Sequence, residues 1–159
     1  MNQIRLRPSS AEDDDFLFEL YCETRADEVR AFGWSADEQA AFLSSQYGMR
    51  RQQYRALGEQ VRSSLILDGD RPIGMLVLID MPTEIVLSDI ALVPGYRNRG
   101  IGGALIRNEL AEAAHKGKPM SLHVTTSNPA ARLYARLGFG VVEDDGLYIH
   151  MRATPPLQS

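Results

Sequence analysis

The chain has 159 residues, of which 44% are hydrophobic and 24% charged, and these values are ordinary for a globular protein. This length predicts one domain, over residues 1–153, followed by a frayed tail over residues 154–159. The excess of 21 Asp and Glu over 17 Lys and Arg gives a formal net charge of −4, which argues against a nucleic-acid partner.

The first predicted elements are a strand and a helix. Residues 3–7 alternate polar and apolar side chains, which is the period of a half-buried strand. Ser9, followed three positions later by Glu12, has the pattern of a capping box. A helix is therefore expected from about residue 10 to residue 30.

A second helix and a hairpin follow. The capping-box pattern recurs at Ser35 and Glu38, and apolar residues come after it at helical spacing, which predicts a long helix. Apolar runs at residues 64–67 and 72–79 flank a turn signal centred on Gly69. We expect these two runs to pair as a β-hairpin.

The middle of the chain predicts a buried strand and a helix. Residues 84–93 are almost all apolar, which is typical of a strand covered on both faces, and their interruptions at Ser88 and Asp89 call for an explanation. Residues 102–116 have helical spacing, and Gly117 suits the position just after a helix end.

The last third predicts a strand, a short helix and two strands. Asn128, followed by a proline, is a helix start. The predicted elements are a strand at residues 120–125, a helix ending at Gly138, and strands near residues 139–142 and 147–152. The order of all elements implies an α/β fold with helices on the faces of a mixed sheet.

Cysteine content and hydropathy suggest where the protein works. Cys22 is the single cysteine, so no disulfide can form within the chain, and the three histidines lack the spacing of zinc ligands. The longest apolar run, residues 73–79, is far too short to span a membrane, and the first residues lack the apolar stretch of a signal peptide. We expect a cytoplasmic protein with no bound metal and no membrane partner.

The segment between residues 93 and 104 combines glycines and arginines at the start of a predicted helix. It reads Pro94-Gly-Tyr-Arg-Asn-Arg-Gly-Ile-Gly-Gly103. Unpaired N–H groups at a helix N-terminus bind phosphate, and glycines let phosphate oxygens approach the backbone. A Walker A loop is excluded because Ile101 replaces its lysine, and a Rossmann fingerprint is excluded by Leu105.

The same segment resembles a known family. The hexapeptide from Arg97 to Gly102 is similar to the Arg/Gln-x-x-Gly-x-Gly/Ala signature with which Gcn5-related N-acetyltransferases (the GNAT superfamily) hold the pyrophosphate of coenzyme A. Residues 89–106 and 122–139 also resemble the cofactor-binding half of that superfamily in order and spacing. The resemblance implies a central, mixed, mostly antiparallel twisted sheet of six to seven strands flanked by about four helices. The alternative for the loop alone is a turn that merely joins strand to helix.

The resemblance implies acetyl-CoA as the co-substrate. The backbone of one strand would bond the pantetheine arm and polarise the thioester carbonyl, and two arginines would flank the pyrophosphate. Asn128 would contact the cofactor in the family manner, although its capping position also accounts for it. The implied cofactor-binding residues are Ile90, Ala91, Leu92, Arg97, Asn98, Arg99, Gly100, Ile101, Gly102, Gly103 and Asn128.

For catalysis the resemblance is less complete. Tyr134 matches the family tyrosine that protonates the departing thiolate, although a tyrosine packed on the sheet is the alternative. Glu84 and Asp89 are the candidate bases, but their opposite parity lets only one point into the active-site face unless the strand has a bulge. Some members carry a glutamate on the strand that here has His123 and Thr125, so the base stays open. A lone histidine on a strand is more often structural than catalytic.

The implied function is an acetyl-CoA-dependent N-acetyltransferase that acylates a primary amine of a small molecule or peptide by direct attack in a ternary complex. The alternatives are an acyltransferase using another acyl-CoA and a non-catalytic acyl-CoA sensor or interaction module. The acceptor site is expected from the first two helices, the loop between them and the last hairpin, and the protein is expected to be a monomer or a homodimer. Cys22 has no patterned histidine partner, so it is not expected to act as a nucleophile.

Overall fold

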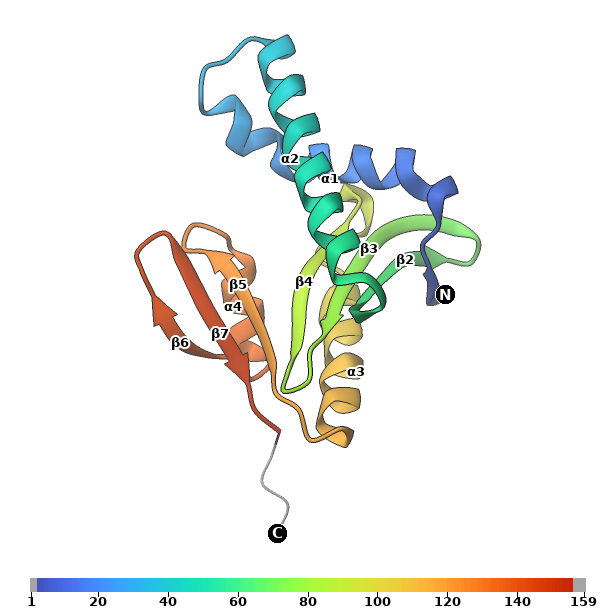
Figure 1. Ribbon diagram of the computed structural model, residues 1–159, viewed down its shortest axis with the longest axis vertical. Helices are drawn as coiled ribbons and strands as arrows, with labels where there is room; N and C mark the ends of the chain where they lie inside the picture. The colour runs from blue at the N-terminus through green and yellow to red at the C-terminus, as the bar shows by residue number, and fades with distance from the viewer. Residues whose placement is uncertain (1–2, 156–159) are drawn as a thin grey trace. The chain divides into compact units, whose positions relative to one another are not determined.

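The computed structural model describes residues 3–155, and its elements follow the predicted order (Figure 1). Within this range, four α-helices and seven strands are joined by short connections. In chain order they are β1 (Ile4–Pro8), α1 (Asp14–Arg30), α2 (Ala36–Leu57), β2 (Val61–Asp68), β3 (Arg71–Asp80), β4 (Ile85–Leu92), α3 (Ile101–His115), β5 (Met120–Thr125), α4 (Ala130–Arg136), β6 (Gly140–Asp144) and β7 (Tyr148–Ala153). Single 3-10 turns occupy Ala11–Asp13, Gly58–Gln60 and Pro94–Tyr96.

The seven strands form one sheet in the order β1-β2-β3-β4-β5-β7-β6. The β1–β2, β5–β7 and β6–β7 pairs are antiparallel, whereas β4 and β5 are parallel. The parallel pair is joined through α3, as a parallel connection requires. The predicted mixed, mostly antiparallel sheet with about four helices is confirmed.

Contacts divide the chain into two compact units. The first comprises Met1–Leu76 and Ala91–Gly95, and the second comprises Val77–Ile90 and Tyr96–Ser159. The predicted single domain therefore stays a prediction, and most of the predicted tail, residues 156–159, lies outside the described residues.

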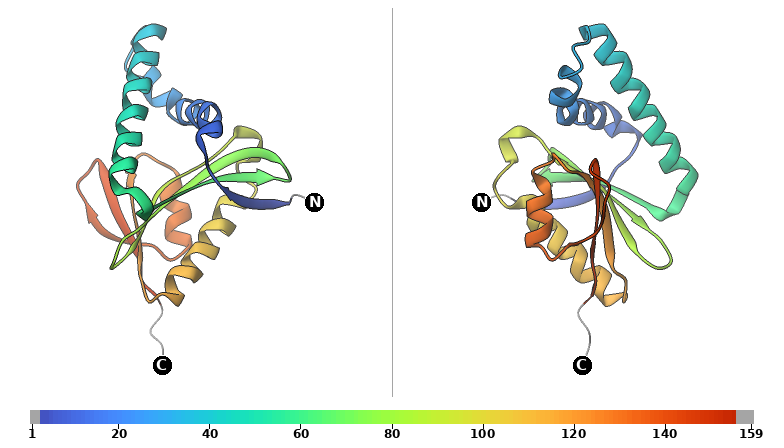
Figure 2. Two further views of the ribbon diagram at one scale, coloured as in Figure 1. Left: turned by 45° about the vertical axis from the view of Figure 1, so that its right-hand side comes forward. Right: turned by 90° about the vertical axis from the view of Figure 1, so that its left-hand side faces the viewer.

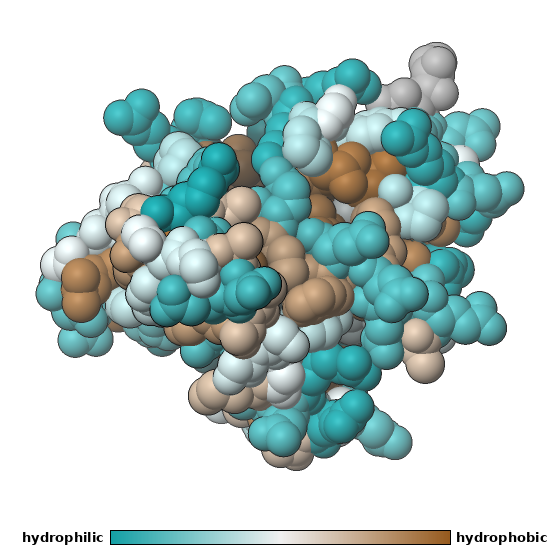
Figure 3. Space-filling model, turned by 90° about the horizontal axis from the view of Figure 1, so that it is seen from above, coloured by the Kyte–Doolittle hydropathy of each residue, from teal (hydrophilic) through white to brown (hydrophobic). Residues whose placement is uncertain are grey.

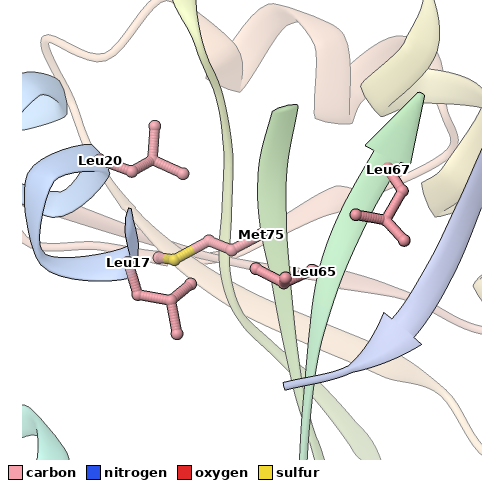
Figure 4. Packing of buried hydrophobic residues seen from close by; sticks show 5 residues of the cluster. All are labelled: Leu17, Leu20, Leu65, Leu67 and Met75. Carbon is pink, nitrogen blue, oxygen red and sulfur yellow. The ribbon is translucent and has the colours of Figure 1, made fainter. Parts of the chain in front are cut away.

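The core of the first unit lies where α1 covers β2 and β3. Figure 4 shows the leucines of α1 directed at the strand residues, with the thioether of Met75 between them. Burying such a side chain contributes about 1.5–3 kcal/mol relative to leaving it exposed. The residues of this cluster are Leu17, Leu20, Leu65, Leu67 and Met75.

The start of the first helix differs from the prediction by one residue. Ser10 and Asp13, and not Ser9 and Glu12, form the capping box, with the Ser10 N–H donating to Asp13 Oδ2 at 2.8 Å. The Ser9 hydroxyl is engaged elsewhere, because it bonds the hydroxyl of Ser63 at 2.8 Å. A 3-10 turn therefore precedes α1. The predicted second box, at the start of α2, is confirmed.

In the second unit, α3 and α4 lie beside each other (Figure 2). A Cβ added to Gly103 of α3 would lie 3.6 Å from Leu133 Cδ1 of α4, so the helices are in contact there. α4 covers the face of β5 that carries Met120, Leu122 and Val124, all of which are buried. The other face of β5 carries the alternate residues, among them the exposed His123.

The surface is mostly hydrophilic in the view of Figure 3, with apolar side chains in patches between polar ones. Single exposed apolar residues are normal on a globular protein. Among residues 3–155, no helix combines the length and the hydropathy that a membrane crossing requires.

Candidate functional site

The loop that the sequence singled out has a special backbone. Gly100 is the N-cap of α3 with φ +78°, in the left-handed region, and Asn98 has φ +60°. The N–H of Ala104 donates to the Gly100 carbonyl at 3.1 Å, which leaves the preceding N–H groups of the first turn without intrahelical acceptors. No side chain caps this end, and no acidic residue lies in its first turn. The geometry leaves backbone donors available to an anion.

Gly102 is not required by the packing of the protein. A Cβ at this position would meet only Ile90 Cδ1, at 3.7 Å, which is an ordinary van der Waals distance. A Cβ at Gly100 would meet nothing within 4 Å, although its positive φ favours glycine. The packing of the described residues therefore gives no reason for a glycine at position 102.

The two arginines of the loop have different surroundings. Arg97 is half-buried, whereas Arg99 is exposed and its guanidinium carbon lies 5.1 Å from the centroid of the Tyr96 ring. This cation–π contact holds the Arg99 side chain at the loop. Both residues bring positive charge close to the N-terminal end of α3, where the helix dipole also favours an anion.

The strands β4 and β5 pair over a short length only. Ile85 pairs with Met120 and Val86 with Ser121, and the register between the two strands ends there. Both strands continue, β5 up to Thr125. Within the second unit the backbone of β4 beyond Val86 and that of β5 beyond Ser121 are therefore not joined to each other, as a strand-like ligand between them would require.

Tyr134 lies on α4 and is buried, with 9% of its surface exposed. Its ring packs edge-on against Phe139 at a centroid distance of 5.9 Å. Burial, together with the negative charge of Asp89, raises the pKa of the Tyr134 hydroxyl to about 12. The hydroxyl is therefore protonated at neutral pH and can donate a proton.

The two predicted carboxylates have separate surroundings. Asp89 acts electrostatically on the Tyr134 hydroxyl, which places the two side chains near each other. Glu84 comes just before β4, and its Oε2 lies 3.9 Å from a guanidinium nitrogen of Arg152 on β7. The structure thus brings Asp89 to the tyrosine and Glu84 to the arginine.

Asn128 begins the turn into α4. Its Oδ1 accepts a hydrogen bond from the N–H of Ala130 at 2.9 Å, so its predicted capping interaction is present. The helix begins at Ala130, one residue after the predicted start, and Pro129 occupies the N-cap. This capping bond fixes the backbone that leads to Tyr134.

The three strand residues predicted to bind pantetheine fall in different units. Ile90 belongs to the second unit and approaches Gly102. Ala91 and Leu92 belong to the first unit, where a Cβ on Gly74 would collide with the Ala91 carbonyl. This close approach explains the glycine at position 74 in an otherwise apolar strand.

One residue escaped the sequence-based reasoning. His150 on β7 pairs with His123 on β5, and their rings stack at a centroid distance of 4.4 Å with an interplanar angle of 9°. The strand register reveals this pair, because the two residues are 27 positions apart in the sequence. Among residues 3–155, no group of three or more potential metal ligands converges.

Comparison with known proteins agrees with this geometry. The Acetyltransferase (GNAT) family matches residues 15–139. A [ribosomal protein bS18]-alanine N-acetyltransferase from Haemophilus influenzae is 29% identical over 87 residues, which cover 54% of this chain and 60% of that protein.

Solved structures share the fold. The PaiA N-acetyltransferase from Thermoplasma acidophilum, in complex with coenzyme A, has a TM-score of 0.74 at 22% identity and covers 96% of this chain and 99% of its own. A spermidine N-acetyltransferase chimera that includes the Vibrio cholerae enzyme has a TM-score of 0.64 at 18% identity, with 96% and 95% covered. Because the family match spans most of the chain, the protein belongs to the GNAT acetyltransferase family and is an acyltransferase.

Proposed function

We propose that this protein is an acetyl-CoA-dependent N-acetyltransferase whose acceptor is a primary amine of a small molecule or peptide. The observation that carries the proposal is the loop before α3, where a glycine that internal packing does not need stands among unpaired backbone donors. We expect it to act in the cytoplasm, as a monomer or a homodimer.

The loop fits a pyrophosphate. The N–H groups of Ile101, Gly102 and Gly103 lie before the first intrahelical bond of α3, so they remain available to phosphate oxygens. Without a Cβ at position 102, those oxygens approach the backbone closely. Arg97 and Arg99 would add charge-assisted hydrogen bonds, while Asn98 and Gly100 supply the positive-φ turns that shape the loop.

The backbone of β4 would hold the rest of the co-substrate. Pantetheine contains amides, which pair with an open strand as an added strand does. In the family manner, the backbone groups of Ile90, Ala91 and Leu92 would bind this arm, and an N–H there would stabilise negative charge on the thioester oxygen. Asn128 would contact the cofactor beside its capping role.

Acetyl-CoA, when bound, supplies an acyl group with a thiol as leaving group. Tyr134 is the proton donor to that sulfur, because its hydroxyl holds its proton at any pH near neutrality. Two protons leave a protonated amine during the reaction: one before attack and one as the amide forms. One of them replaces the proton that Tyr134 gives to the thiolate, and the other reaches solvent. Tyr134 therefore ends the reaction with its proton restored.

Asp89 and Glu84 would support this chemistry in different ways. Burial raises the pKa of the Tyr134 hydroxyl most, and the charge of Asp89 adds to this effect, so Asp89 would help to keep the acid protonated. Glu84 is a candidate base, and its carboxylate lies 3.9 Å from a guanidinium nitrogen of Arg152.

The relatives support an amine acceptor. The curated relative is named an alanine N-acetyltransferase and one solved structure a spermidine N-acetyltransferase, so one acts on a protein and the other on a polyamine. Both acceptors present a primary amine, and this shared group is what we propose for the present chain.

Calorimetric titration with acetyl-CoA tests the clamp. We expect binding to the wild type and at least tenfold weaker binding to Gly102→Glu. The added carboxylate would occupy the pyrophosphate position and repel the phosphates by its charge. Gly48→Glu in α2 is the matched control, since a Cβ at position 48 meets nothing within 4 Å and this variant is expected to bind normally. Equal affinity of all three proteins would refute the clamp.

Release of free thiol from acetyl-CoA then tests turnover. The acceptors are a peptide with N-terminal alanine, spermidine, lysine and an aminoglycoside, each compared with the reaction without enzyme. Turnover with one of them identifies the acceptor class. Tight binding without turnover on any amine would instead indicate an acyl-CoA sensor.

A further inference from the structure

The stacked histidines form a pair of titratable groups on one face of the sheet. His123 of β5 and His150 of β7 are register partners, so both side chains project from the same face. His123 is exposed and His150 is half-buried. Within residues 3–155, no ion pair involves either imidazole.

The pair lies next to the point where β4 and β5 part. The pairing of those strands ends at Ser121, and His123 is the next residue of β5 on the same face, about 7 Å further along. The opposite face of β5 is covered by α4, which carries Tyr134. The proton donor and the histidine pair therefore belong to opposite faces of β5.

The charged groups around the pair are few. On β7 the same face carries Tyr148 and Arg152, two residues before and after His150. On β6, Glu143 is the register partner of His150. Glu84, beside β4, is bound to Arg152. The carboxylate that the sequence offers as a base is thus engaged, whereas the imidazoles are stacked only on each other.

We propose that His123 accepts the proton of the acceptor amine and that His150 positions His123 and shares its charge. The inference rests on the proposed function, because it assigns the acceptor side of the same reaction. His123 is the catalytic residue, since its exposed imidazole meets the amine, and His150 is a positioning residue that the amine does not touch.

The chemistry balances without a further reactant. The amine N–H bond breaks, the proton moves to an imidazole nitrogen of His123, and the freed lone pair of the amine attacks the thioester carbon. As the C–S bond breaks, sulfur takes the proton of Tyr134, and the second proton lost by the attacking nitrogen restores the Tyr134 hydroxyl. The imidazolium of His123 releases its proton to solvent, which its exposed position allows. Histidine suits this task because its ordinary pKa lies near neutrality.

Stacking makes the two rings act together. The stacked ring of His150 restricts the orientation of the His123 ring, and a positive charge on one imidazole lies directly beside the other. Removing His150 therefore frees the His123 side chain and changes the surroundings in which it accepts a proton.

The experiment compares amines that do and do not need a base. The rates of His123→Gln, His150→Gln and the control His115→Gln are measured with two amines, after subtraction of the rate without enzyme. The first amine is the one identified by turnover, and the second is hydroxylamine, which is largely unprotonated at neutral pH. We expect His123→Gln to lower kcat/KM for the protonated amine by roughly 10²-fold. Its rate with hydroxylamine should stay within about threefold, and the control His115→Gln, an exposed histidine at the end of α3, should approach the wild type with both amines.

The pH profile separates the two histidines. We expect the acidic limb of kcat/KM to disappear in His123→Gln and to shift in His150→Gln, while acetyl-CoA affinity by calorimetry stays unchanged in both. Equal losses with hydroxylamine and the protonated amine, or an unaltered profile in both variants, would overturn the proposal. A wild type that binds acetyl-CoA but acylates no amine would overturn the proposed function, and this inference with it.

Discussion

Removing the hydroxyl of Tyr134 tests the assignment of the proton donor. In Tyr134→Phe the ring still fills its place against Phe139, and none of the side-chain hydrogen bonds found among residues 3–155 involves the hydroxyl. The thermal midpoint should therefore change by less than about 2–4 °C, the shift expected for 1 kcal/mol in a chain of this size. The affinity for acetyl-CoA should also be unchanged.

The rate should fall much more than the stability. A pKa of about 12 lies roughly 3.5 units above that of an ordinary thiol, so complete transfer from Tyr134 to the thiolate is uphill by about 5 kcal/mol. Tyr134 is therefore effective only if its own proton is replaced as the amide nitrogen loses one. Loss of this step should lower kcat by roughly 10²–10³-fold, the usual range for a general acid.

The assay is thiol release at saturating acetyl-CoA, with Tyr21→Phe as the matched control. Tyr21 is also buried, with 3% of its surface exposed, and it lies on α1 in the first unit. A rate within threefold of the wild type in Tyr134→Phe would show that Tyr134 only packs against its neighbours and does not donate the proton. A similar loss in both variants would attribute the effect to general disturbance of the fold.

Three further predictions concern stability. Gly100→Ala should lower the thermal midpoint by about 2–4 °C, since an alanine at φ +78° costs about 1 kcal/mol, whereas Gly95→Ala, where φ is not positive, should not. Hydrogen bonding to Arg7 lowers the pKa of Asp13, so this contribution to stability is present above the ordinary carboxyl pKa and is lost as the pH falls through the lowered value. In thermal melts below about pH 4, the midpoint of Asp13→Asn should fall less than that of the wild type. Equal falls would contradict a stabilising contribution from the Asp13 carboxylate. Ile106→Ala should destabilise by about 2–5 kcal/mol in urea titrations, because only 1% of its surface is exposed; a loss below 1 kcal/mol would contradict tight packing there.

Local patterns predicted most of the elements. The spacing of apolar residues and the glycines and prolines between them predicted the strands and helices to within a few residues. The predicted bounds of β5 match the observed ones at both ends. The first capping box was misplaced because Ser9 and Ser10 are equivalent in a sequence pattern. The choice between them is made by Ser63, 54 positions away, whose hydroxyl holds Ser9.

The site could be predicted only in part. The loop residues form one continuous segment, so their backbone chemistry is visible in the sequence. The link between Asp89 and Tyr134 and the stacking of His123 on His150 depend on strand register, which local patterns do not encode. The engagement of Glu84 by Arg152 has the same origin.

The pairing of β5 also bears on how the chain acquires its structure during synthesis. All six residues of β5 pair with β7, whereas only two pair with β4. β7 leaves the ribosome after β5, α4 and β6, so β5 must wait for a strand made later before most of its backbone hydrogen bonds can form. Nascent chains that stop before Tyr148 should therefore hold β5 as an unpaired edge exposed to other chains.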